Sequence, residues 1–226
     1  MLIGTAVAAL LGGCALPGGT ASPARTTAGA AAPTDASGTS SGAAADGGAD
    51  ATDDPQDPAR YADHVVRFGR EAGVNPQLIM AILYVESYKP HDPQFERSWQ
   101  KMDPDAAFGV ANMHRAAFDD TKRGRPFAHR SWEELPDDPA LAVQAQAWYL
   151  HDLRRRLPAR PLVTTRTTGR LTVDELLALG FNAGPGNMLA FARGVKPGPS
   201  ATDYLNTLRH DWNVAAEVLP KPAPSS

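Results

Sequence analysis

The chain has 226 residues, of which 42% are hydrophobic and 21% are charged, with a formal net charge of −3 and one cysteine. A lone cysteine excludes an intrachain disulfide framework, and basic residues that are not interleaved with aromatic ones argue against a nucleic-acid-binding surface. The six histidines lack the spacing of metal ligands, so we expect no metal site. We also expect no cofactor and no nucleic-acid partner.

The N-terminal residues have the features of an export signal. The apolar run from Leu2 to Leu11 is too short to span a bilayer, which needs about 20 residues, and fits the core of a signal peptide. No Lys or Arg precedes it, which leaves open whether Met1 is the true start. The run ends in Leu-Gly-Gly-Cys, which resembles a bacterial lipoprotein processing box. The resemblance implies cleavage before Cys14, a lipid on its sulfur and anchoring to the outer face of the membrane. The alternative is a chance cysteine in a cleaved signal.

Residues 15–58 have the composition of a disordered linker. They consist mainly of Ala, Gly, Ser, Thr, Pro and Asp, without an aromatic residue, and so lack the apolar side chains that offset chain entropy. Residues 1–58 carry one arginine and six aspartates, a net charge of −5; because the whole chain carries −3, residues 59–226 carry +2. This slight basicity is compatible with an anionic cell-wall surface. We expect residues 220–226 to fray as a disordered tail.

The patterns of residues 59–219 are helical, and this length suffices for one domain with a core. Steps of three and four between apolar residues, with caps and breakers, predict helices over Ala59–Ala72, Asn75–Lys89, Asn112–Asp120, Asp138–Leu157, Val173–Leu179, Asn187–Arg193 and Ala201–Leu219. In the last of these, Tyr204 belongs to the apolar stripe. The sequence therefore predicts a mainly α fold.

The segments between these helices contain capping and loop signals. Capping boxes are expected at Ser131 with Glu134 and at Thr172 with Glu175. The polar, proline-containing stretch Pro90–Asp105 reads as a long loop, and Thr121–Arg130 reads as another. Strand signals are scarce, and only Arg160–Arg170 is a candidate for a small hairpin.

The helix over residues 75–89 ends in the most informative side chain. Asn75 suits the N-cap and Pro76 the first helical position, and the following residues to position 85 are nearly all apolar, as in a core helix. Glu86 then appears, on the same face as three apolar residues of the preceding turns, Ile79, Ile82 and Leu83. A carboxyl over an apolar surface favours its protonated form, the state that a general acid needs. The alternative is a solvated glutamate at a helix terminus.

Two later segments give Glu86 a context. Ala107–Met113 reads Ala-Phe-Gly-Val-Ala-Asn-Met, and Gly180–Gly186 reads Gly-Phe-Asn-Ala-Gly-Pro-Gly. Together with Glu86-Ser87, they resemble in order and spacing the lytic transglycosylase and goose-type lysozyme superfamily. In that family a Glu-Ser pair closes a core helix, an Ala-x-Gly-Leu-Met-Gln segment follows after a loop, and a Tyr-Asn-Ala-Gly segment comes later. The resemblance covers roughly residues 60–215 and implies a lysozyme-like helical domain with a substrate cleft.

The resemblance implies cleavage of the β-1,4 bond between N-acetylmuramic acid (MurNAc) and N-acetylglucosamine (GlcNAc) in peptidoglycan. Glu86 matches the family's catalytic acid/base. It would protonate the glycosidic oxygen and then take the C6-hydroxyl proton of the muramic residue, closing a 1,6-anhydro ring without water. The first alternative, a hydrolytic muramidase, needs a second carboxylate about 5–5.5 Å or about 6.5–9.5 Å away. The acids after Glu86 that could serve, and that are otherwise solvated loop residues, are Asp92, Glu96, Asp103 and Asp105.

The resemblance also implies substrate-binding positions, with two departures from the family. Asn112 stands where Gln is usual, and Phe181 stands where a Tyr hydroxyl would face the carboxyl or the sugar. Phenylalanine there either makes the surroundings of Glu86 more apolar and the carboxyl easier to protonate, or removes one hydrogen bond to the transition state, worth about 1 kcal/mol. Separately, Trp99 near Glu86 is a candidate for stacking on a sugar. The expected substrate-binding residues are Ser87, Gly109, Asn112, Phe181, Asn182, Ala183, Gly184 and Trp99.

The two departures leave a second alternative open, a peptidoglycan-binding lipoprotein that has a cleft but little or no turnover. In either case we expect a monomer of the cell envelope. Its partners would be peptidoglycan glycan strands and, through Cys14, the membrane.

Overall fold

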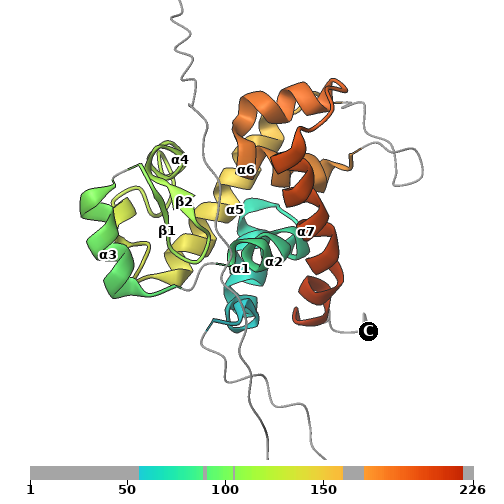
Figure 1. Cartoon of the computed structure of the whole chain (residues 1–226). Coiled ribbons are helices and arrows are strands. Elements are labelled where there is room, and N and C mark those ends of the chain that lie inside the picture. Colours follow the sequence, from blue (N-terminus) through green and yellow to red (C-terminus); the bar gives the residue numbers. More distant parts are fainter. Residues whose placement is uncertain (1–55, 89–90, 104, 160–170, 221–226) are drawn as a thin grey trace, which may run out of the picture. The chain divides into compact units, whose positions relative to one another are not determined.

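The computed structural model describes residues 56–88, 91–103, 105–159 and 171–220, and this part of the chain is mainly helical (Figure 1). The elements, with η for 3-10 helices, are η1 (Pro58–Tyr61), α1 (Ala62–Ala72), α2 (Pro76–Glu86), α3 (Pro93–Met102), β1 (Ala107–Phe108), β2 (Met113–His114), α4 (Arg115–Thr121), η2 (Trp132–Glu134), α5 (Pro139–Arg156), α6 (Val173–Ala192) and α7 (Pro199–Glu217). No helix within these ranges is both long and apolar enough to cross a membrane.

Several sequence predictions lie outside the described residues. They are the signal with Cys14, the linker up to residue 55, the hairpin candidate at 160–170 and the tail from residue 221. The described structure begins before the expected domain boundary at Ala59, because Asp57 and Pro58 already belong to η1 and its cap. The Asp57 carboxylate accepts a hydrogen bond from the backbone N–H of Ala59 at 2.9 Å, and Pro58 is buried.

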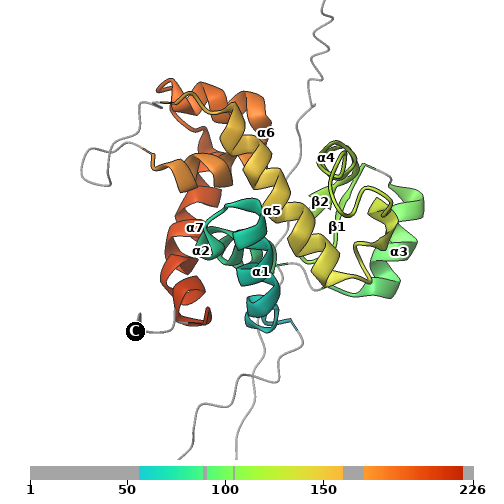
Figure 2. The same cartoon turned by 180° about the vertical axis from the view of Figure 1, so that it is seen from behind.

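The core is built around α2, as its sequence predicts. The Asn75 side chain caps the helix by accepting from the backbone N–H of Gln77 at 3.1 Å, and Pro76 occupies the first turn. The six residues Leu78–Leu83 are each at most 1% exposed. Helices α1, α5, α6 and α7 and the short η1 all contact α2 (Figures 1 and 2). A helix that is apolar on every side is thus surrounded on every side.

Helix α5 runs between two groups of elements. Figures 1 and 2 show α3, β1, β2 and α4 on one side of it and α6 and α7 on the other. The predicted capping boxes are confirmed at the start of η2, with Ser131 and Glu134, and of α6, with Thr172 and Glu175. The predicted helices α5 and α7 are confirmed to within about two residues at each end.

Arg130 ties the start of α5 to η2. Its guanidinium donates to Glu134 Oε2 and to Asp138 Oδ2, each at 2.7 Å. The hydrogen bond from Arg130 and that from the backbone N–H of Ser131 lower the pKa of the Glu134 carboxyl. Burial by itself raises the pKa of the Asp138 carboxyl, but the backbone N–H of Leu141 and the Arg130 guanidinium lower it to a net value below the ordinary one. Both carboxylates therefore stabilise the fold in their ionised form.

The prediction of a loop over Pro90–Asp105 is wrong, because this stretch contains helix α3. Asp92 caps it by accepting from the backbone N–H groups of Gln94 and Phe95 at 2.8 and 3.1 Å, and Pro93 occupies its first turn. The proline that suggested a loop is thus a helix-starting residue.

The predicted helix over Asn112–Asp120 begins three residues late, and a small hairpin precedes it. Strands β1 and β2 pair antiparallel, with Phe108 opposite Met113, so the segment Ala107–Met113 forms a hairpin with a tight turn. The separate helix expected over Asn187–Arg193 is the second part of α6, which breaks at Gly184, with φ 82° and ψ 164°. Glycine readily adopts a positive φ, so the Gly-Pro-Gly sequence forms a kink within one helix and not a loop between two helices.

Candidate active site

Glu86 is the last residue of α2, and its side chain is buried as its position on the helix predicts. The residue is 6% exposed, and the apolar face beneath it, formed by Ile79, Ile82 and Leu83, is at most 1% exposed. Buried carboxyl groups need hydrogen-bonding partners, because an unpaired one costs several kcal/mol. The alternative of a solvated glutamate at the helix end is wrong.

Asn112 supplies the first partner of Glu86. Its Nδ2 donates to Glu86 Oε2 at 2.9 Å. Asn112 has a positive φ of 47° and closes a turn in which its backbone N–H donates to the Gly109 carbonyl at 2.7 Å. Asparagine tolerates this backbone region better than most residues, which gives a physical reason for asparagine at position 112.

Gly109 is required at the start of the same turn. Its φ is 73°, and a Cβ atom there would lie 2.8 Å from the backbone carbonyl oxygen of Leu135. Gly109 therefore has a backbone role in this turn, and its predicted part in substrate binding stays a prediction. It lets the turn pass close to the chain after η2 and brings Asn112 onto Glu86.

Tyr204, on α7, supplies the second partner, and the sequence reading missed it. Its hydroxyl donates to Glu86 Oε1 at 3.3 Å. Helix α7 runs antiparallel to α2, since Gln77 at the start of α2 donates to the carbonyl of Trp212 late in α7 at 2.8 Å. This pairing carries Tyr204 from the first turns of α7 to the end of α2. The tyrosine had been assigned to an apolar stripe, and its neighbours Leu205 and Leu208 are indeed buried.

The Tyr204 hydroxyl keeps its proton. Burial, followed by the charge of Glu86 and the hydrogen bond to it, raises the pKa of the Tyr204 phenol well above its ordinary value. A hydroxyl can donate to a carboxylate and can also accept from a carboxylic acid, whereas an amide N–H only donates. Tyr204 can therefore contact Glu86 Oε1 whether that carboxyl is ionised or neutral, whereas the Asn112 amide can only donate to Oε2.

Phe181 and the residues after it lie on α6 and make other contacts. The Phe181 ring packs edge-on against Tyr149, with centroids 5.8 Å apart. Asn182 is exposed, and no hydrogen bond joins it to Glu86 in the part of the chain that the structure describes. Ala183 accepts from Asn187 Nδ2 at 2.8 Å, and Gly184 forms the kink of α6. The hydroxyl that contacts Glu86 comes from Tyr204 on α7.

Ser87 and Trp99 have local roles in the structure. Ser87 is the C-cap of α2, and its Oγ donates to the Tyr84 carbonyl at 2.7 Å; its predicted part in substrate binding stays a prediction. Trp99 is 42% exposed on α3, and its ring lies nearly parallel to Phe95, with an interplanar angle of 12°. The predicted stacking of Trp99 on a sugar stays a prediction.

The acids after Glu86 differ in exposure: Asp92 and Asp105 are exposed, as solvated acids would be, whereas Glu96 is largely buried. Asp92 caps α3, and Asp103 accepts from the backbone N–H of Asp105 at 3.2 Å. The Glu96 side chain is only 12% exposed and holds two partners, His91 and the backbone N–H of Gly109. The reading of Glu96 as a solvated acid is therefore wrong.

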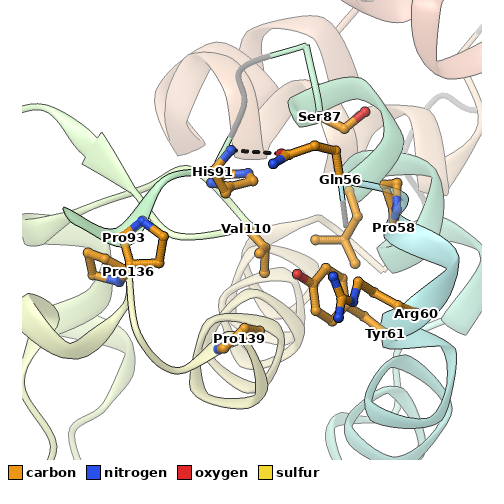
Figure 3. A pocket seen from close by; sticks show the side chains of 11 residues that line it. Gln56, Pro58, Arg60, Tyr61, Ser87, His91, Pro93, Val110, Pro136 and Pro139 are labelled. Atoms are coloured by element: carbon orange, nitrogen blue, oxygen red, sulfur yellow. Dashed lines mark hydrogen bonds between the residues drawn. The ribbon is translucent and has the colours of Figure 1, made fainter. Parts of the chain in front are cut away.

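A pocket of about 310 Å³ adjoins the end of α2 (Figure 3). Ser87 and Val110 both line it, so it touches the residue after Glu86 and the turn that carries Asn112. Tyr61 and His91 also line it, and the backbone N–H of His91 donates to Gln56 Oε1 at 2.9 Å. Glu86 itself does not line this pocket, so a substrate cleft over Glu86 stays a prediction.

Within the described ranges, no group of three or more His, Cys, Asp or Glu side chains is placed to hold a metal ion. Comparison of the chain with models of known protein families gave no match, and comparison with curated proteins gave none either. The chemistry assigned to this site therefore depends on its residues and their geometry.

Proposed function

We propose that this domain is a peptidoglycan lytic transglycosylase, which cleaves the MurNAc–GlcNAc β-1,4 bond and leaves a 1,6-anhydromuramic end. The observation that carries the proposal is the buried carboxyl of Glu86, whose oxygens accept from Asn112 at 2.9 Å and Tyr204 at 3.3 Å. Residues from α2, the β1–β2 turn and α7 meet at this carboxyl, although they lie far apart in the chain.

In the proposed reaction Glu86 is the sole acid/base. The proton of the neutral Glu86 carboxyl passes to the glycosidic oxygen while the bond from that oxygen to C1 of the muramic residue breaks. The resulting carboxylate is stabilised by the Asn112 N–H and the Tyr204 O–H, both of which donate to it. Glu86 then takes the proton of the C6 hydroxyl, whose oxygen bonds to C1 and closes the anhydro ring. The carboxyl ends in its starting state, and no water is consumed.

Two of the neighbouring acids have structural roles at the start of α3 and at the β1–β2 turn, which supports this reaction over hydrolysis. A hydrolase would use a second carboxylate to hold water or to attack C1. Asp92 and Glu96, two of the acids that could serve, already accept hydrogen bonds from backbone N–H groups. We also propose that the protein is exported to the cell envelope and acts there as a monomer, held to the membrane by a lipid on Cys14.

The products of the reaction test the proposal. The purified protein, with Cys14→Ala to avoid acylation, is incubated with peptidoglycan, and the released muropeptides are identified by mass spectrometry. We expect 1,6-anhydro ends, and a lowering of their release by at least about 100-fold in Glu86→Gln. Glu71→Gln, an exposed acid paired with Arg67 on α1, is the matched control and should cleave like the parent.

Other products would assign another function. Reducing ends without anhydro ends would identify a hydrolytic muramidase. If neither the parent nor Glu86→Gln released glycan, the enzymatic proposal would be rejected. Sedimentation of the protein with insoluble cell wall would then test the alternative of a binding lipoprotein.

A further inference from the structure

Glu96 is bonded to the turn that carries Asn112. Glu96 lies on α3, and its Oε2 accepts from the backbone N–H of Gly109 at 2.9 Å. Gly109 is buried, and its N–H lies just beyond the paired residues Phe108 and Met113 of the hairpin. A buried N–H that loses its acceptor costs about 1–3 kcal/mol, so the Glu96 carboxylate holds the start of the turn in place.

The turn transmits this constraint to the catalytic carboxyl. Gly109 and Asn112 are joined by a hydrogen bond of 2.7 Å across the turn, and both have a positive φ, 73° and 47°. So tight a turn moves as a unit. Its first residue is held by Glu96 and its last residue donates to Glu86 Oε2, which gives one continuous series of contacts from α3 to α2.

His91 fixes the other oxygen of the Glu96 carboxylate. His91 Nδ1 lies 2.8 Å from Glu96 Oε1, and the His91 side chain is 19% exposed. The backbone N–H of His91 is in turn held by Gln56 at the wall of the pocket in Figure 3. The rotamer of Glu96 is thus set from both sides.

We infer that Glu96, oriented by His91, is a positioning residue that holds Asn112 on the catalytic carboxyl of Glu86. The inference rests on the proposed function for its effect on rate, whereas its effect on the turn can be observed without any reaction. Glu96 does not touch the reacting atoms in this assignment. It acts through Gly109 and Asn112.

Steady-state kinetics on soluble, uncross-linked glycan strands test the inference. We expect Glu96→Ala to lower kcat by about 10- to 100-fold with little change in KM, because a displaced partner of the acid/base impairs the chemical step more than binding. Glu96→Gln should recover most of the activity, since its amide oxygen still accepts from Gly109. Glu71→Ala, on the exposed face of α1, is the matched control and should leave kcat unchanged.

A double-mutant cycle separates positioning from general destabilisation. If Glu96 acts through Asn112, Glu96→Ala should cost less than about twofold in kcat when Asn112 is already alanine. Costs that multiply independently in the double variant would overturn the inference, as would equal losses in Glu96→Gln and Glu96→Ala.

NMR gives a readout that needs no turnover. In full-length Glu96→Ala we expect the Gly109 amide to exchange with solvent at least about tenfold faster, and the side-chain amide of Asn112 to shift. These changes in a protein that cleaves no glycan would reject the proposed function and keep the positioning role. Unchanged Gly109 and Asn112 signals would overturn the positioning role whatever the activity.

Discussion

Replacing Tyr204 by phenylalanine removes one hydroxyl from the candidate site and keeps the ring. The lost contact is the hydrogen bond of 3.3 Å to Glu86 Oε1. A hydrogen bond to a charged group contributes about 1.5–3 kcal/mol, and this one is longer than the typical O–H···O distance of about 2.7–2.8 Å. We therefore take the lower end, about 1.5 kcal/mol. Because about 1.4 kcal/mol corresponds to a tenfold change in rate, kcat should fall about tenfold.

Tyr84→Phe is a matched control for this prediction. The Tyr84 hydroxyl also donates to a carboxylate, Asp57 Oδ1 at 3.1 Å, but that acid is not the proposed catalyst. Burial, then the charge of Asp57, raises the pKa of the Tyr84 phenol, so this hydroxyl is likewise a protonated donor.

The assay is the rate of anhydromuropeptide release, measured beside the thermal unfolding midpoint of each variant. Tyr84→Phe should lower the midpoint and leave kcat unchanged, whereas Tyr204→Phe should lower kcat. Equal rates for Tyr204→Phe and the parent would refute the reasoning. The same would follow if both variants lost rate in proportion to their loss of stability.

Two further predictions concern stability. Gly109→Ala should lower the free energy of unfolding in urea by more than the about 1–3 kcal/mol of backbone strain, because its φ is 73° and the new Cβ would lie 2.8 Å from a carbonyl oxygen. Gly124→Ala, with φ 70° and open space around it, should cost only the strain, and equal losses would contradict this account. The pKa values of Glu134 and Asp138 are lowered by folding, so their stabilisation is present at neutral pH and is lost as the pH falls below their unfolded values of 4.5 and 3.8. Arg130→Met should flatten this loss in urea titrations between about pH 7 and about pH 3, and an unchanged slope would count against it.

Local signals in the sequence predicted the frame of the site correctly. A cap at Asn75 and a proline after it begin α2, and its uninterrupted apolar residues require burial on every side. The same helix periodicity places Glu86 over the apolar face of α2. These features depend on residues within a few turns of one another, so the sequence is sufficient to read them.

Prediction from local sequence failed where a residue's role depends on backbone geometry, or where the same residue types occur both in loops and at helix starts. The polar, proline-containing stretch Pro90–Asp105 was predicted to be a loop, yet Asp92 caps α3 and Pro93 begins it. Asn112 was placed at the start of a helix, but the left-handed turn from Gly109 holds it outside α4. The periodicity of apolar residues predicts no structure at either place, because the segments are polar or short.

Only the tertiary structure decided which groups surround Glu86. Tyr204 lies 118 positions after Glu86 and reaches it because α7 packs antiparallel on α2. Asn112 reaches the same carboxyl because a buried backbone N–H on its turn is held by Glu96. In the sequence, Tyr204 is one member of an apolar stripe and Glu96 is one acid among several. Long-range packing brings Tyr204 to Glu86 and Glu96 to Gly109, since a buried carboxyl and a buried N–H must both be satisfied.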